Sequence, residues 1–373
     1  MNRAGPLPRA GGAQRRRTRA LEARAGPLPS LLARNEDELI DWLRRRLGPD
    51  GLVGDDAAPL PLGPDAGDAR WAATVDHQIE GVHFPPGLDP APVARRLLAV
   101  NLSDLAAVGA EPRLALLALA AAPGFDHQRF FRALLAACAR HRVTLAGGDL
   151  SALPAGGARL AASLTLLGRL PEGGAWLARG AARPGDALWV GGMLGESSAG
   201  RHLLARGAQL AGRRVELAGR LGLGGALAAA ARRAVRRHLA PVPQLDLGRL
   251  LGRRAAAAPA HPPAAIDVSD GLARDLGRLA RASGAGAEVE LEALPLPAAL
   301  PALAERLGLD PVRLALAGGE DYVLLFTLPP GERPPVPGCT RIGTITARRG
   351  LTAVGDGKRQ GLDESGWDHL DRD

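Results

Sequence analysis

The segment A-P-V-A-R-R-L-L-A-V-N-L-S-D-L-A-A-V-G-A-E-P-R-L-A-L-L-A-L-A-A at residues 91–121 places a helix pattern directly before a strand pattern. Residues 91–108 read as a helix that ends at Gly109, because glycine readily adopts the left-handed conformation found just past a helix. The apolar run at 114–121 favours a strand, because Pro112 and Pro123 bound it closely. A helix followed at once by a strand predicts a mixed α/β fold.

The same mixture of patterns continues on both sides of this segment. A helix is expected near residues 35–47, a short buried strand at 70–76 ending in Asp76, a helix at 126–141, and strands at 143–146 and 159–169. The polar stretch R-G-A-A-R-P-G-D at 179–186 marks a boundary near residue 175. Strands and helices also alternate beyond it, so we expect two mixed α/β domains, at residues 32–174 and 175–373, after a tail at 1–31.

The positive charge of the chain is concentrated in its tail. Residues 1–34 hold eight arginines and one acid, so they carry +7 of the total of +8, and the rest carries about +1. The tail is rich in Gly, Pro and Arg and has no apolar core of a signal peptide, so we expect a disordered arm. The near-neutral body lacks a basic patch interleaved with aromatic residues, which argues against a specific nucleic-acid-binding protein.

Other classes of protein are excluded by what the sequence lacks. It has no apolar run of about 18 residues, which argues against a membrane-spanning helix. Cys138 and Cys339 are far apart and form no C-x-x-C pair, which argues against a thiolate zinc site or a disulfide framework and fits the cytoplasm. The only lysine, Lys358, is not followed by Ser or Thr, so a G-x-x-x-x-G-K-[ST] phosphate loop is impossible. Metal ions and arginine would have to neutralise any nucleotide phosphates.

Aspartates recur where predicted strands or buried helices end, in small apolar surroundings. They are Asp55 and Asp56 in G-D-D, Asp76 in T-V-D, Asp104 in N-L-S-D, Asp149 in G-G-D, and Asp267 and Asp270 in I-D-V-S-D-G. An unpaired carboxylate is costly in such surroundings. Mg²⁺ prefers carboxylate, water and phosphate oxygens, so a cluster of these acids predicts a site for several magnesium ions.

Each of these motifs also has an ordinary structural explanation. Asp55 with Asp56, Gly147 to Asp149 and residues 318–321 suit turns. Asp104 suits the solvent side of a helix, and Ser269 suits an N-cap with Asp270 beside the helix N-terminus. His83 suits a semi-buried histidine. The repeated placement of acids, rather than any one motif, favours a site.

Seven motifs in one order carry a resemblance to a known family. They are G-D-D-A-A, T-V-D-H-Q-I-E-G-V-H-F, A-V-N-L-S-D-L-A-A-V-G-A-E-P, A-G-G-D, R-P-G-D, A-I-D-V-S-D-G-L and A-G-G-E-D-Y, with G-W-D-H-L at 366–370. The chain resembles the thiamine-monophosphate kinases, in the superfamily that includes aminoimidazole ribonucleotide synthetase. The resemblance covers roughly residues 32–370.

The resemblance implies ATP-dependent phosphorylation of thiamine monophosphate to thiamine diphosphate by direct in-line transfer. It also implies a cytoplasmic homodimer in which the N-terminal domains together form a β-barrel. The implied Mg²⁺ ligands are Asp56, Thr74, Asp76, Asp104, Asp149, Asp267 and Asp270, of which Asp104, Asp149 and Asp270 would be catalytic. Gly148, Asp149, Arg179 and Ser269 would contact ATP, and His83, Glu320 and Trp367 would contact the thiamine phosphate.

The chain departs from the family after Thr74. Val75 stands where the family usually has a hydroxyl residue, and His77, Gln78 and Ile79 stand where it usually has an apolar pair. Another ATP-dependent enzyme of the superfamily, acting on a different small molecule, therefore stays open, as does a metal-dependent phosphatase. The selenophosphate-forming and hydrogenase-maturation relatives rely on reactive cysteines, and neither Cys138 nor Cys339 lies in such a motif.

Overall fold

The computed structural model describes residues 36–47, 54–60, 70–154, 156–211 and 214–367. The chain forms two compact units, of which the second runs from Asp55 to Trp367. The described part of the first unit contains helix α2 (Glu36–Leu47), which confirms the helix expected near residues 35–47. The predicted disordered tail at 1–31 lies outside the described residues.

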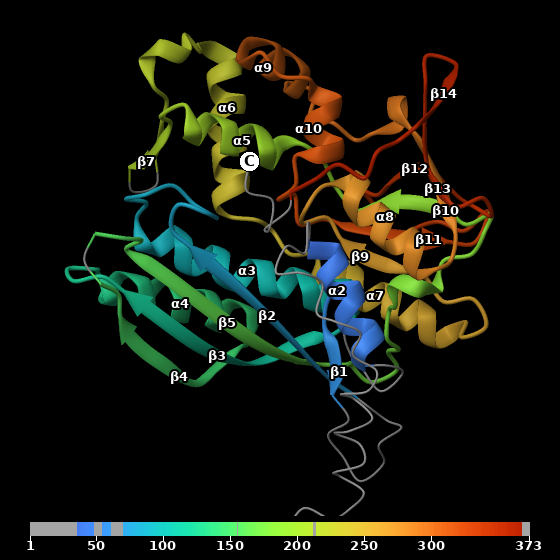
Figure 1. Ribbon diagram of the computed structural model, residues 1–373, viewed down its shortest axis with the longest axis horizontal. Helices are drawn as coiled ribbons and strands as arrows, with labels where there is room; N and C mark the ends of the chain where they lie inside the picture. The colour runs from blue at the N-terminus through green and yellow to red at the C-terminus, as the bar shows by residue number, and fades with distance from the viewer. Residues whose placement is uncertain (1–35, 48–53, 61–69, 155, 212–213, 368–373) are drawn as a thin grey trace, which may run out of the picture. The chain divides into compact units, whose positions relative to one another are not determined.

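The N-terminal part of the second unit is a five-stranded sheet covered on one face by two helices. Its strands lie in the order β1-β2-β5-β3-β4, and only β3 and β4 are parallel neighbours. Their bounds are β1 (Ala58–Leu60), β2 (Trp71–Ile79), β3 (Glu111–Ala121), β4 (Thr144–Ala152) and β5 (Leu160–Arg169). Helices α3 (Pro90–Ala107) and α4 (His127–His141) lie on one face of the sheet (Figure 1). The sheet is open, so this single chain does not form a closed barrel.

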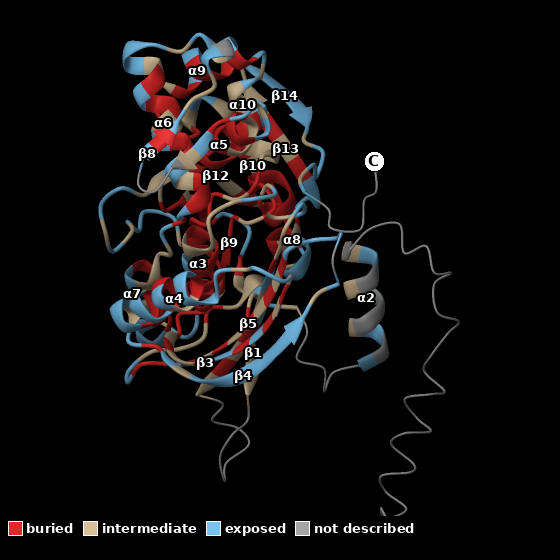
Figure 2. Ribbon diagram, turned by 90° about the vertical axis from the view of Figure 1, so that its left-hand side faces the viewer, coloured by how far each residue is buried: buried red, intermediate tan, exposed pale blue. Residues whose placement is uncertain are grey.

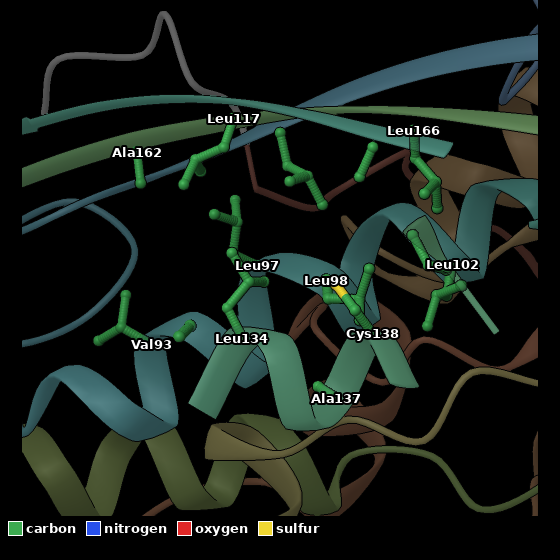
Figure 3. Packing of buried hydrophobic residues seen from close by; sticks show 14 of the residues in the cluster. Val93, Leu97, Leu98, Leu102, Leu117, Leu134, Ala137, Cys138, Ala162 and Leu166 are labelled. Atoms are coloured by element: carbon green, nitrogen blue, oxygen red, sulfur yellow. The ribbon is translucent and has the colours of Figure 1, made fainter. Parts of the chain in front are cut away.

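Apolar side chains fill the space between these helices and the sheet. Figure 3 shows Val93, Leu97 and Leu134 from the helices beside Leu117 and Ala162 from the strands. Helix α3 is buried along most of its length, and the side chain of Asp89 caps its N-terminus by accepting from the Ala91 N–H at 2.9 Å. Strand β4, at the edge of the sheet, is largely exposed (Figure 2).

Two strands run past the residues at which the sequence interpretation ended them. Strand β2 continues from Asp76 to Ile79, and β4 continues through Gly147, Gly148 and Asp149 to Ala152. Both predicted ends are therefore wrong. The cause is pairing between strands: β2 bonds to β5 as far as Ile79 opposite Ala161, and β4 follows β3 as far as Ala152 opposite Ala121. Local sequence does not encode such long-range partners.

The C-terminal part of the second unit contains a seven-stranded mixed sheet in the order β14-β13-β10-β12-β6-β11-β9. Its strands are β6 (Ala187–Val190), β9 (Ala265–Asp267), β10 (Gly286–Glu290), β11 (Leu324–Leu328), β12 (Thr340–Thr346), β13 (Gly350–Gly355) and β14 (Lys358–Gly361). The helices are α5 (Glu196–Ala205), α6 (Gly225–Leu239), α7 (Leu245–Ala257), α8 (Leu272–Ala282), α9 (Leu300–Leu307) and α10 (Pro311–Ala317). Short 3₁₀ turns occupy η2 (Arg179–Ala181), η3 (Gly219–Leu221) and η4 (Leu291–Ala293), and β7 (Gln209–Ala211) pairs with β8 (Arg214–Glu216).

Both parts mix helices and strands, as the sequence predicts. Strands β9 and β11 pair so that Asp267 lies opposite Leu324, which places this acid at the end of a buried edge strand. Among the described residues, no helix is long and apolar enough to cross a membrane.

Candidate metal and phosphate site

Three predicted metal ligands converge from distant parts of the chain. Asp56 precedes β1, Asp104 lies in the last turn of α3, and Asp267 is the final residue of β9. One carboxylate oxygen from each lies within 4.8 Å of the other two. Oxygen donors at this spacing suit a hard divalent cation.

Neighbouring hydroxyl and amide groups hold these acids in place. The Thr74 hydroxyl donates to Asp104 Oδ2 at 2.5 Å, and the Ser103 hydroxyl donates to Asp267 Oδ2 at 2.6 Å. The buried Asn101 side chain accepts from the backbone N–H of Asp76 at 3.1 Å. Because residues 101, 103 and 104 lie in the last turns of α3, this helix end connects strand β2 with strand β9.

The acids raise one another's cost of ionisation. Burial, followed by the charges of Asp76, Asp267 and Asp56, raises the pKa of Asp104 well above its usual value, against the lowering effect of Thr74. Burial, followed by the charge of Asp56, likewise raises the pKa of Asp267. Asp76 thus acts on both groups, which places it within their electrostatic reach. A cation among the acids would relieve this repulsion.

The predicted ATP ligand Arg179 is bound to a predicted metal ligand. Its Nη2 lies 2.6 Å from Asp56 Oδ1 and its Nε lies 3.2 Å from Asp56 Oδ2. The backbone N–H of Arg179 donates to Asp55 Oδ1 at 3.0 Å. Burial lowers the pKa of Arg179, but the adjacent Asp56 more than offsets this and raises the pKa above its usual value. Both acids of the G-D-D motif therefore have a partner in η2.

The loop after β9 is organised by an acid that the sequence interpretation missed. Asp275, in the first turn of α8, accepts from the backbone N–H groups of Ser269 and Asp270, both at 3.0 Å. Arg278 Nη1 lies 2.6 Å from Asp270 Oδ2 and 3.1 Å from Asp275 Oδ1. Burial and the neighbouring Asp270 raise the pKa of Asp275 to about 7. An acid in the first turn of a predicted helix often accepts from backbone N–H groups there, so the position of Asp275 in the sequence could have indicated this role.

The three residues predicted to contact the thiamine phosphate come from three separate segments. His83 Nδ1 accepts from the Ile79 backbone N–H at 3.1 Å, which places the ring proton on Nε2. Glu320 has a φ of +68°, and its backbone N–H donates to the Ser269 carbonyl at 2.6 Å. The backbone N–H of Trp367 donates to the Asp270 carbonyl at 2.9 Å, and the Arg201 guanidinium lies 5.8 Å from the Trp367 ring centre. Glu320 and Trp367 are thus both tied to the Ser269–Asp270 loop.

Asp149 and Gly148 lie on a different face of the structure from the converging acids. Strand register places Asp149 opposite Ala118, Ala118 opposite Ser163, and Ser163 opposite His77, so Asp149 is three strand spacings, about 14 Å, from β2. Its carboxylate accepts from Ser151 at 3.1 Å and lines an outward-facing cavity of about 290 Å³ with His77 and Ser163. Within one chain, the structure does not bring Asp149 to Asp56, Asp104 and Asp267.

Comparisons with known families match both parts of the second unit. Residues 54–170 match the family described as AIR synthase related protein, N-terminal domain, and residues 183–356 match AIR synthase related protein, C-terminal domain. The thiamine-monophosphate kinases of Salmonella typhimurium and Escherichia coli are each 36% identical over 353 residues, which is 91% of this chain and 97% of each relative. That of Aquifex aeolicus is 31% identical over 335 residues, 89% of this chain and 97% of the relative.

Solved structures give the same match. A structure described as AaThiL complexed with AMPPCP and TMP has a TM-score of 0.75 and 30% identity, over 92% of this chain and 99% of that chain. The thiamine monophosphate kinase from Stenotrophomonas maltophilia has a TM-score of 0.62 and 32% identity, over 82% of this chain and 92% of that chain. A hydrogenase maturation protein HypE in complex with ATP, at 20% identity and a TM-score of 0.58, shares the fold.

Proposed function

Because this chain belongs to the thiamine-monophosphate kinase family, we propose that it phosphorylates thiamine monophosphate to thiamine diphosphate with ATP. Relatives of that name over nearly the whole chain, and the likeness to a structure with AMPPCP and TMP, support the activity. The convergence of Asp56, Asp104 and Asp267 within 4.8 Å is the observation that carries the chemistry. Family membership also supports the cytoplasmic location and the domains at 32–174 and 175–373.

The donor set fits Mg²⁺. Asp56, Asp104 and Asp267 supply oxygen ligands, and the raised pKa values of Asp104 and Asp267 reflect repulsion that a bound cation would relieve. Thr74, Asp76, Asp149 and Asp270 are the further ligands proposed from the family resemblance. Bound magnesium would neutralise charge on the transferred phosphoryl group and align donor with acceptor.

The protein's own groups bind and orient the two substrates. Arg179 would offer a planar fork to the ATP phosphates once it leaves Asp56. Ser269, in the loop after β9, and Gly148, in strand β4, are the other proposed ATP contacts. The acceptor oxygen belongs to a phosphate and is already anionic, so direct in-line transfer needs no strong general base. His83 would donate from Nε2, while Glu320 and Trp367 would hold the organic part of the acceptor.

We also propose that the outer face of the five-stranded sheet forms a homodimer interface, as a shared barrel between two copies. This face exposes Val75 by 61% and Leu116 by 43%, and strand register places both opposite Thr165, on the side away from the helices. Such exposure is unusual for large apolar side chains on a sheet. Gly148 and Asp149 belong to the same strand β4, so dimerisation would bring them beside a second chain. Analytical ultracentrifugation tests this face. Leu116→Glu should yield monomers, whereas Leu135→Glu, the same change at an exposed leucine of α4, should leave the dimer intact.

The activity is tested by incubating purified protein with ATP, Mg²⁺ and thiamine monophosphate and measuring thiamine diphosphate. Product that requires all three supports the proposal. Normal ATP binding without product would favour a different small-molecule acceptor, for which His77 and Gln78 are the sequence departures to examine. Release of phosphate from thiamine monophosphate without ATP would identify a phosphatase instead.

A further inference from the structure

A buried arginine lies between strand β2 and the loop that carries Glu320. Arg96, in α3, is 1% exposed. Its Nε donates to Gln78 Oε1 at 3.0 Å, its Nη1 donates to the His238 carbonyl, and its Nη2 donates to Glu320 Oε2. The guanidinium also lies 5.6 Å from the ring centre of Tyr322. Each of the three guanidinium nitrogens thus has a hydrogen-bond partner, and one of these partners, Glu320, is a proposed contact of the thiamine phosphate.

The charge that meets Glu320 comes from Arg96 rather than from histidine. His238 Nδ1 lies 3.5 Å from Glu320 Oε2 and 3.3 Å from the Ser197 hydroxyl. Burial, followed by the charge of Arg96, lowers the pKa of His238 well below its usual value, so this ring is neutral. Among the described residues, Arg96 is therefore the cation in contact with Glu320.

Glu320 is held in one orientation by its backbone as well. Its φ of +68° lies in the left-handed region, which a glutamate rarely adopts without support. The hydrogen bond from its N–H to Ser269 and the ion pair from its carboxylate to Arg96 fix both ends of the residue. Its side chain is 21% exposed, and Arg96 engages Oε2, which leaves Oε1 as the oxygen that could accept from a ligand.

We propose that Arg96, oriented by Gln78, is a positioning residue that aims Glu320 at the phosphate acceptor. This inference rests on the proposed function and adds a group that touches no substrate. A carboxylate held through one oxygen presents the other to N–H donors or to a cationic ring, and thiamine monophosphate carries an amino group and a thiazolium. Gln78 is 2% exposed, and its Oε1 accepts from Arg96 Nε, so a buried polar contact fixes the orientation of the guanidinium.

The test compares KM for thiamine monophosphate with KM for ATP in three variants. Arg96→Met removes the charged hydrogen bond to Glu320 and should raise KM for thiamine monophosphate about 30-fold. Gln78→Met removes only the neutral hydrogen bond to Arg96 and should raise it about 5-fold. Arg96→Lys, which retains the charge, should recover most of the loss. KM for ATP should stay within about 2-fold in all three, since Arg96 contacts Glu320, a proposed thiamine-phosphate contact, and none of the proposed ATP contacts. Arg95→Met, an exposed arginine on the same helix, is the matched control.

A double-mutant cycle separates positioning from packing. If Arg96 acts through Glu320, adding Arg96→Met to Glu320→Gln should not raise the acceptor KM further. Equal rises of KM for thiamine monophosphate and for ATP, or additive effects in the cycle, would overturn the inference about Arg96. The proposed function would still stand if the wild-type protein makes thiamine diphosphate. Wild-type protein that makes no thiamine diphosphate would overturn the function and the acceptor assignment together. If Arg96→Met does not fold, Gln78→Met and Arg96→Lys decide the question by the same ratio of KM values.

Discussion

Arg179 and Asp56 form a bidentate ion pair, with Nη2 2.6 Å from Oδ1 and Nε 3.2 Å from Oδ2. The family resemblance implies that the arginine contacts ATP and that the aspartate binds a metal ion, and in the structure the two side chains form an ion pair. The Asp56 side chain is only 4% exposed, so it needs a countercharge at all times. A bound cation would replace Arg179 as the partner of Asp56, and the ATP phosphates would replace Asp56 as the partner of Arg179.

Removing the arginine should therefore weaken the free protein and strengthen its response to magnesium. Arg179→Met leaves the buried Asp56 carboxylate unpaired, which should lower the free energy of unfolding by about 3 kcal/mol without ligands. Mg²⁺ alone should then raise the melting temperature more in the variant than in the wild type, because no arginine competes for Asp56. Thermal unfolding with and without Mg²⁺ measures both effects. Arg313→Met, an exposed arginine on α10, is the control, and an equal Mg²⁺ response in Arg179→Met would contradict competition.

Asp104→Asn should separate stability from activity. The amide of the variant can still accept from the Thr74 hydroxyl, and it cannot ionise among the neighbouring acids. The free energy of unfolding should therefore rise by about 1 kcal/mol. Turnover should fall about 1,000-fold, equivalent to about 4 kcal/mol, because a metal ligand is lost. Kinase assays and denaturant unfolding test the two halves. Asp246→Asn, whose carboxylate is 88% exposed, should change neither, and near-normal turnover of Asp104→Asn would remove it from the site.

Sequence reasoning succeeded where the determining interactions are local. The C-terminal end of α3 follows from Gly109, apolar residues at helical spacing predicted α2, and the sequence also predicted α4 and β5. It placed Asp56, Asp104 and Asp267 among the candidates, although their proximity depends on three distant segments.

Sequence reasoning failed where pairing between strands determines the end of a strand. Strand β4 continues through Asp149 because β3 lies beside it, and the pleat then turns this acid to the outer face. Since side chains alternate between the faces of a strand, an acid predicted to end a strand changes its surroundings when the strand continues. Asp275 and Arg96 escaped notice because their roles lie in contacts with backbone and side chains far along the chain.

The stability of the metal-free protein should fall as pH rises from about 4 to about 7. Burial raises the folded-state pKa of Asp321 to about 7, while an unfolded aspartate titrates near 4, so the folded protein binds more protons in this window. Each such group can reduce the free energy of unfolding by at most about 1.4 kcal/mol per pH unit. The raised pKa values of Asp104 and Asp267 act in the same direction.

Magnesium should reduce only the part of this decline that comes from Asp104 and Asp267. Denaturant unfolding at several pH values, with Mg²⁺ or with a chelator, measures the slopes. Asp321→Asn should flatten the decline equally in both conditions, because Asp321 accepts from the Gly195 and Ser197 N–H groups rather than facing the three acids. A decline that Mg²⁺ leaves unchanged would show that no cation binds the cluster.

Adjacent glycines in β4 offer a test of how closely β3 and β4 must approach. Gly147 and Gly148 have φ values of +156° and +152°, so an alanine meets nearly the same backbone strain at either position. A Cβ at Gly148 would lie 1.8 Å from the Leu117 carbonyl oxygen, whereas at Gly147 the nearest atom is a Leu116 methyl at 3.8 Å. Gly147→Ala should therefore cost about 1 kcal/mol, and Gly148→Ala about 3 kcal/mol or more, because the clash forces the parallel strands apart. Denaturant unfolding measures the difference, and equal losses would mean that β4 shifts freely along β3.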